Sequence, residues 1–175
     1  MKYPQAYIDY LLYFHVERDF FECHEVLEEY WKSEAGAKEQ VWVGFIQLAV
    51  ALYHYRRKNY KGAERMLISS QQLFTKETSK IHDLGVDSDQ LLKDLPNIKK
   101  DIEEKAPYQD YNIPINNEEL LRVCRNHCTK KELQWGAPSD LNNHYLINKH
   151  SLRNRADVIN ERARQQQIKK RFKAN

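Results

Sequence analysis

Apolar residues recur every three or four positions along most of the chain, which is the spacing of one face of an α-helix. The pattern predicts five helices, over residues 4–14, 20–31, 40–57, 59–85 and 87–102. The third is apolar on almost every side, as is typical of a helix at the centre of a bundle. The predicted fold is therefore all-α, a compact multi-helix bundle.

Polar residues mark where these helices begin. Two pairs have the spacing of a capping box, in which a side chain accepts a backbone N–H of the first turn: Asp19 with Glu22, and Asp87 with Gln90. Asn59 is a third expected N-cap. Pro96 interrupts the fifth apolar stripe and is expected to break or kink that helix, because proline lacks the N–H and its ring clashes with the preceding turn.

The pattern changes beyond the fifth helix. Residues 106–116 contain Pro107 and Pro114 and show no helical period, so they are predicted to form a linker. A short helix and then a longer, increasingly basic one follow, which predicts a basic helical C-terminal extension over residues 117–175. The bundle domain itself is accordingly expected over residues 3–105.

Composition supports an intracellular helical protein. Only five Gly and five Pro occur in 175 residues, whereas Leu, Glu, Lys, Arg, Gln and Ala are plentiful. Three cysteines without a CxxC pair suit reduced thiols better than a disulfide framework. No apolar run approaches the ~18 residues of a membrane span, and the N-terminus lacks the apolar core of a signal peptide. We therefore expect no transmembrane segment and a cytoplasmic location.

Charge is distributed unevenly along the chain. Residues 149–175 carry nine Lys or Arg against two acids, whereas the first 148 residues carry nineteen against twenty-three. Such a tail can bind nucleic acid, a ribosome or an anionic surface, although a solvated charged helix is the simpler interpretation. Phe172 is its one aromatic residue for base stacking, so sequence-specific recognition is not expected. The residues predicted to contact nucleic acid or membrane are Arg162, Arg164, Lys169, Lys170 and Arg171.

Side chains suited to chemistry gather in residues 20–31. One helical turn separates His24 from Glu28, and Trp31 projects in nearly the same direction, so an imidazole and a carboxylate point into an aromatic-rich surface. Glu25 lies at the edge of this surface. A carboxylate one turn away can orient a histidine and raise its basicity, and the same spacing can present two metal ligands.

The third predicted helix carries a matching polar stripe. Gln47 and His54 are seven residues apart on an otherwise apolar helix, with small residues on the same stripe that would let another helix approach closely. Buried polar groups without partners cost on the order of 1–3 kcal/mol each. We therefore expect the His24–Glu28 pair to face these two side chains in one buried polar cluster.

Three uses of such a cluster are open. It can hold two helices in register without further function, it can bind a ligand or substrate with acid–base chemistry, or it can bind a metal. The candidate catalytic residues, which are also the candidate metal ligands, are His24, Glu28 and His54; the candidate binding residues are Glu25, Trp31 and Gln47.

Three blocks of sequence resemble a known family. They are residues 20–31 (FFECHEVLEEYW), 44–54 (GFIQLAVALYH) and 59–63 (NYKGA). Their order and spacing are similar to the domain-of-unknown-function 309 family of small helical bacterial and archaeal proteins. The resemblance covers residues 3–80 and implies a compact all-α domain. It also implies a shared polar set, at His24, Glu25, Glu28, Gln47 and His54, but no activity.

Together these observations favour a cytoplasmic helical domain that binds a protein partner or a small ligand between its second and third helices, with no particular cofactor indicated. One alternative is an acid–base or metal-dependent hydrolase that uses His24, Glu28 and His54. Another is a nucleic-acid- or ribosome-associated protein that acts through the basic tail.

Overall fold

The structure is a computed structural model that describes residues 3–152. Its elements are α1 (Gln5–Leu12), the π-helix η1 (Tyr13–Glu17), α2 (Phe20–Lys32), α3 (Gln40–Arg56), α4 (Tyr60–Lys76), α5 (Thr78–Asp83), α6 (Ser88–Glu103), α7 (Glu118–Lys130), α8 (His144–Ile147) and α9 (Lys149–Leu152). The described residues contain no strand beyond one isolated bridge, between Val86 and Ile115. The predicted all-α fold is confirmed.

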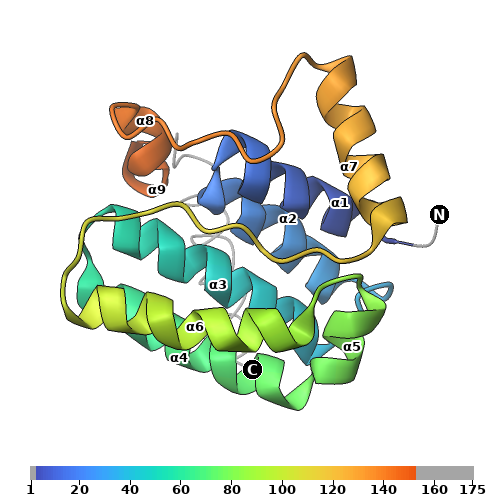
Figure 1. Ribbon diagram of the computed structural model, residues 1–175, viewed down its shortest axis with the longest axis horizontal. Coiled ribbons are helices and arrows are strands. Elements are labelled where there is room, and N and C mark those ends of the chain that lie inside the picture. Colours follow the sequence, from blue (N-terminus) through green and yellow to red (C-terminus); the bar gives the residue numbers. More distant parts are fainter. Residues whose placement is uncertain (1–2, 153–175) are drawn as a thin grey trace, which may run out of the picture.

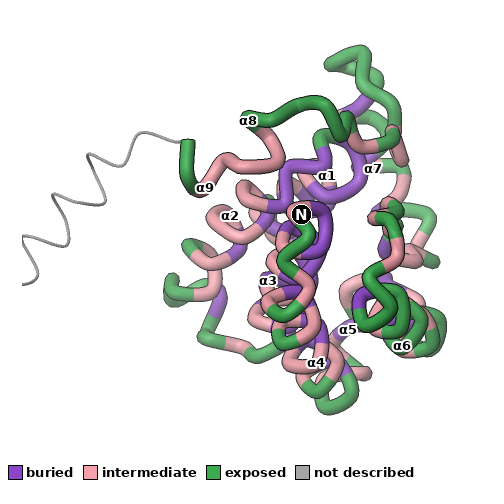
Figure 2. Tube along the Cα trace, turned by 90° about the vertical axis from the view of Figure 1, so that its left-hand side faces the viewer, coloured by how far each residue is buried: buried purple, intermediate pink, exposed green. Residues whose placement is uncertain are grey.

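Helix α3 lies at the centre of the molecule (Figures 1 and 2). It packs most extensively against α4 and α2, while α1 packs on α2 and α6 packs on α4. Twelve of its 17 residues are buried, so few of its side chains face water. The prediction that the third helix is the central one is confirmed, because only a helix covered on most sides can be apolar all round.

Gly44 sets how closely α3 and α4 approach each other. A Cβ atom at this position would lie 2.6 Å from the ring of Phe74 on α4, so a larger residue would push the two helices apart. The hydroxyl of Ser70, also on α4, donates a hydrogen bond to the carbonyl of Gly44 at 2.8 Å. As expected from the sequence, the small residue Gly44 on the polar stripe of α3 allows a neighbouring helix to approach closely, and that helix is α4.

The three predicted N-caps are confirmed. The backbone N–H groups of Glu22, Gly62 and Gln90 donate to the side chains of Asp19, Asn59 and Asp87 at 3.0, 3.1 and 2.9 Å. The expected break at Pro96 does not occur, since α6 continues through it. Pro96 is exposed, so water can reach the carbonyl that its missing N–H leaves without a partner. The fourth predicted helix instead divides at Glu77 into α4 and α5.

The connection expected after α1 is a π-helix. Its last turn ends at Arg18, whose φ of 53° lies in the left-handed region that non-glycine residues seldom adopt. Two polar side chains of this turn, His15 and Arg18, are each only 1% exposed. The ring centroid of His15 lies 4.4 Å from that of Trp135, a residue far along the chain.

The buried guanidinium of Arg18 joins three parts of the chain. It donates to the backbone carbonyls of Phe14, Tyr111 and Ala137 at 3.1, 2.9 and 2.8 Å, and to the side-chain oxygen of Asn112 at 2.8 Å. A buried charge is tolerated when its donors are satisfied in this way. The bonds therefore tie two C-terminal segments to η1.

The predicted linker lies along the bundle (Figure 1, yellow trace). The backbone N–H of Asp87 donates to the carbonyl of Pro114 at 2.7 Å. Beyond it, Leu120 and Cys124 of α7 belong to the same hydrophobic core as the preceding helices. The described part of the C-terminal extension thus shares one core with the bundle. The five residues predicted to contact nucleic acid or membrane, between Arg162 and Arg171, lie outside the described residues.

Replacement of Arg18 by Met should lower the free energy of unfolding by more than about 3 kcal/mol, because one buried and three partly buried hydrogen bonds are lost together. Urea titration followed by far-UV circular dichroism measures the change. Arg122→Met, on the exposed face of α7, is the matched control and should change stability by less than about 0.5 kcal/mol. Similar small losses in both variants would contradict the role given to Arg18.

His15 should make the fold sensitive to acid. Burial, and then the charge of Arg18, lower the pKa of His15 from 6.5 to about 3. Below pH 6.5 the side chain of His15 binds a proton in the unfolded chain but stays neutral in the folded chain. The contribution of His15 to the free energy of unfolding is therefore fully present above pH 6.5 and is lost progressively towards pH 3. At pH 5 this loss amounts to roughly 2 kcal/mol.

His15→Phe keeps an aromatic ring beside Trp135 but cannot titrate. Between pH 7.5 and pH 5, we expect the free energy of unfolding of this variant to fall by roughly 2 kcal/mol less than that of the parent. Urea unfolding at the two pH values measures the difference. The same substitution at His82, which is exposed on α5, is the matched control. An identical pH dependence in parent and His15→Phe would show that His15 is not buried as a neutral group.

Candidate functional site

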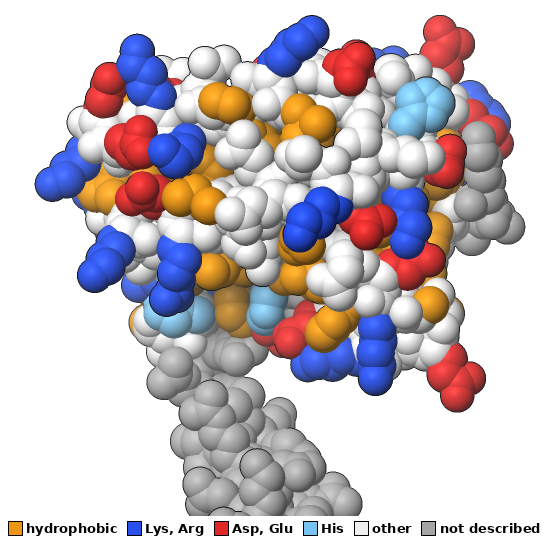
Figure 3. Space-filling view, turned by 90° about the horizontal axis from the view of Figure 1, so that it is seen from below, with side chains coloured by type: hydrophobic (Ala, Val, Ile, Leu, Met, Phe, Trp, Pro, Cys, Tyr) orange, Lys and Arg blue, Asp and Glu red, His pale blue; other side chains and the backbone are white. Residues whose placement is uncertain are grey.

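A cavity of about 190 Å³ lies where α2, α3 and α9 meet. It is lined by apolar side chains and three imidazoles, from Phe20, Phe21, His24, Val50, Tyr53, His54 and His150. Figure 3 shows histidine side chains beside hydrophobic ones at the lower edge of the face in view. Two of the predicted site residues, His24 and His54, therefore reach the same cavity from different helices.

His24 is held by carboxylates of its own helix. Its Nδ1 lies 3.1 Å from Oε1 of Glu25 and its Nε2 lies 3.2 Å from Oε2 of Glu28. Lys32 approaches Oε1 of Glu28 at 2.8 Å, and the His24 side chain is 30% exposed. Both ring nitrogens thus already face an acceptor. The interpretation of His24 as the base of a hydrolase stays a prediction.

His54 is oriented by the residue that caps the next helix. The Oδ1 of Asn59 accepts the N–H of Gly62, so the Nδ2 of Asn59 faces His54 Nδ1 at 3.1 Å. An amide nitrogen only donates, so Nδ1 must accept, and a neutral His54 carries its proton on Nε2. Burial, followed by the charges of Arg57, His150 and Arg65, lowers the pKa of His54, which favours this neutral form.

The expected hydrogen-bonded cluster across α2 and α3 is not formed. His24 bonds within α2 and His54 bonds to Asn59, while Oε1 of Gln47 is buried without a hydrogen-bond partner in the described part of the chain. Glutamates one and four residues from His24 are its nearest acceptors because they share its helix. Gln47 and Trp31 are not among the residues that line the cavity, and neither is Glu25 or Glu28.

Two residues of the site escaped the sequence pattern. Tyr53 reads as one more apolar position of α3, yet its hydroxyl lies 2.7 Å from Nδ1 of His150. His150 is 97 positions away in the chain, and no periodicity links it to α3. Its one signal in the sequence was its place at the start of the basic tail, residues 149–175.

The described residues contain no group of three or more His, Cys, Asp or Glu side chains that could hold a metal ion. His24, Glu28 and His54 are therefore not assembled as a metal site within residues 3–152. Cys124 and Cys128 are buried in α7, and burial, followed by the charge of Cys128, raises the pKa of Cys124 to about 12. Within the same residues, no helix is both long and apolar enough to cross a bilayer.

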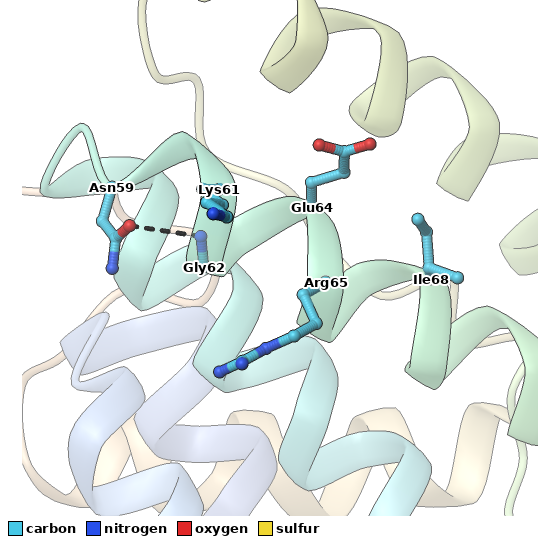
Figure 4. A pocket seen from close by; sticks show the side chains of 6 residues that line it. All are labelled: Asn59, Lys61, Gly62, Glu64, Arg65 and Ile68. Atoms are coloured by element: carbon cyan, nitrogen blue, oxygen red, sulfur yellow. Dashed lines mark hydrogen bonds between the residues drawn. The ribbon is translucent and has the colours of Figure 1, made fainter.

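A larger hollow, of about 510 Å³, lies on the surface of α4 (Figure 4). Its lining residues are Asn59, Lys61, Gly62, Glu64, Arg65 and Ile68. The described side chains that line it come from one helix and its cap, whereas those of the smaller cavity converge from three helices. Convergence of apolar walls with a few polar groups is typical of ligand sites, so we assign the site to the smaller cavity.

Comparison with known proteins identifies the family of the chain. The family model described as "Domain of unknown function (DUF309)" matches residues 7–66, which include η1, α2, α3 and the Asn59 cap. The chain is 48% identical over 170 residues to the "Uncharacterized protein YpuF" of Bacillus subtilis (strain 168), a match that covers 97% of this chain and 98% of that protein. No solved structure matches the chain. On the strength of these two matches, the chain belongs to the DUF309 family.

Proposed function

We propose that this protein binds a small, mainly apolar ligand in the cavity between α2 and α3. The observation that carries the proposal is the convergence of four apolar side chains and three imidazoles on one space of about 190 Å³. Apolar walls provide most of the affinity in such sites, and a few polar groups set the orientation of the ligand.

The volume of the cavity limits the size of the ligand. A dry apolar cavity of ~150 Å³ in a protein core is large enough to bind benzene. The space of about 190 Å³ therefore suits one ring, or a short branched chain, with a small polar substituent. Phe20, Phe21 and Tyr53 offer aromatic surface to a ring.

The polar end of the ligand should be an acceptor. A neutral His54 presents its Nε2–H as a donor, because Nδ1 is engaged by Asn59. Arg57 and Arg65 add positive charge around His54, as their lowering of its pKa shows. The guanidinium of Arg57 also lies 5.3 Å from the ring centroid of Tyr53, on the cavity wall. This surrounding favours a carboxylate over an ammonium group.

Benzoate and benzylamine, which share a ring and differ in charge, test this assignment. We expect benzoate to cause saturable shifts of backbone amide signals in α2 and α3 in ¹H–¹⁵N NMR spectra, and benzylamine to bind at least tenfold more weakly. Val50→Phe, which fills the cavity, should weaken benzoate binding at least tenfold. Val43→Phe, two turns away on α3 and outside the cavity, should retain it.

Equal affinity for both probes, or benzoate shifts confined to α4, would contradict the proposal. Thermal melting of the two valine variants shows whether a loss of binding reflects unfolding instead.

His54→Phe keeps a ring in the cavity wall but removes the N–H donor. We expect the Kd for benzoate to rise roughly tenfold, because a hydrogen bond to a charged acceptor contributes about 1.5 kcal/mol or more. The Kd for uncharged benzyl alcohol should change less than threefold. His82→Phe serves as the control, since His82 lies on the exposed face of α5. A similar loss for both ligands would indicate that His54 acts only through packing.

A further inference from the structure

Residues 148–150 contact α2 and α3 mainly through polar groups, and His150 also packs its ring edge-on against Tyr53 on one side of the cavity. Lys149 reaches α2 from the C-terminal segment: its Nζ lies 2.5 Å from Oδ2 of Asp19 and 2.7 Å from Oε1 of Glu22. Burial lowers the pKa of Lys149, but its hydrogen bonds to these two carboxylates outweigh that effect and raise it. The ion pairs therefore favour the charged form of a half-buried lysine.

The residues on either side of Lys149 reach α3. The Oδ1 of Asn148 accepts a hydrogen bond from Nε of Arg57 at 3.1 Å. The hydroxyl of Tyr53 accepts the backbone N–H of His150 at 3.2 Å and lies 2.7 Å from the Nδ1 of His150. Three consecutive residues thus bridge α2 and α3 across the mouth of the cavity, and His150 itself forms part of the wall.

Little apolar burial supports this bridge. Neither α8 nor α9 contains a buried residue, and Leu141, Tyr145 and Leu152 are exposed by 53%, 55% and 55%. The ion pair of Lys149 with Asp19 is largely buried, since the two side chains are 15% and 9% exposed, but no buried apolar residue of α8 or α9 adds to it. A segment held by a few polar contacts can open without unfolding the core. The central helix α3, in contrast, is buried over most of its length (Figure 2).

We propose that residues 148–150 form a latch that opens to admit the ligand and closes over it. A lid is favoured over a plug, because a space of about 190 Å³ remains beside His150 while the contacts of residues 148–150 are made. The identity of the ligand rests on the proposed function. The opening of residues 148–150, in contrast, can be measured in the chain without ligand. Lys149 is the residue on which closure depends, since it carries the two ion pairs.

Lys149→Glu should open the latch by placing a third carboxylate beside Asp19 and Glu22. Tyr53 is buried under His150, so hydroxyl-radical footprinting of the ligand-free chain should label Tyr53 at least fivefold faster in this variant. Tyr55, which is also buried but bonds to the carbonyl of Ala106, is the internal control and should not change. Lys149→Arg should keep the slow rate of the parent.

Lys130→Glu provides the matched charge reversal, because Lys130 is exposed at the end of α7. It should leave the labelling of Tyr53 unchanged. Salt screens ion pairs, so 1 M NaCl should accelerate Tyr53 labelling in the parent but not in Lys149→Glu. The half of this measurement made on the parent needs no variant that could misfold.

The same variants are then tested with benzoate by NMR line-shape analysis. Faster dissociation together with weaker binding in Lys149→Glu supports a lid. Unchanged Tyr53 labelling in Lys149→Glu and at high salt would overturn the latch, whether or not benzoate binds. Faster labelling in a chain that binds neither probe would uphold the latch as an opening device and refute the proposed ligand site instead.

Discussion

The buried charge of Arg18 is the constraint on which the arrangement of the chain depends. A guanidinium keeps its charge at any physiological pH, so a fold that buries it must bring acceptors to it. Phe14 provides one from the same turn, and the others come from residues 111–112 and 137. These contacts return the second half of the chain to η1. The carbonyl of Arg18 also accepts a bond from Arg56 on α3, at 2.8 Å, which joins the turn to the central helix.

The same framework positions the cavity. The guanidinium of Arg56 lies 4.8 Å from the ring centroid of Phe20, which is one of the cavity walls. Just beyond the same end of α3, Asn59 both caps α4 and determines which nitrogen of His54 is the donor. Structural residues thus set the chemistry of the site. Replacing one of them would change ligand preference as well as stability, which is why the stability of each variant must be measured beside its binding.

Two histidines of the cavity have different roles because their surroundings differ. His24 is clamped between two glutamates of α2 and contributes a fixed wall. His54 has one nitrogen engaged by Asn59 and stands among positive charges, which leaves a donor for an anionic ligand. His150 closes the site from a segment held mainly by polar contacts. A rigid floor with a cover held mainly by polar contacts suits the ligand exchange that we propose for this site.

Much of this protein follows from its sequence alone. The sequence predicted the helical class, the central α3, three N-caps and the family, because periodicity and capping involve residues within four positions of one another. It also selected His24 and His54. Only the tertiary structure decided that His24 and His54 share a cavity without bonding to each other, that Pro96 is accommodated, and that the predicted linker packs onto the core. It alone brought His150 to Tyr53 across 97 positions. Such partners depend on how distant segments pack, and local pattern carries no information about that.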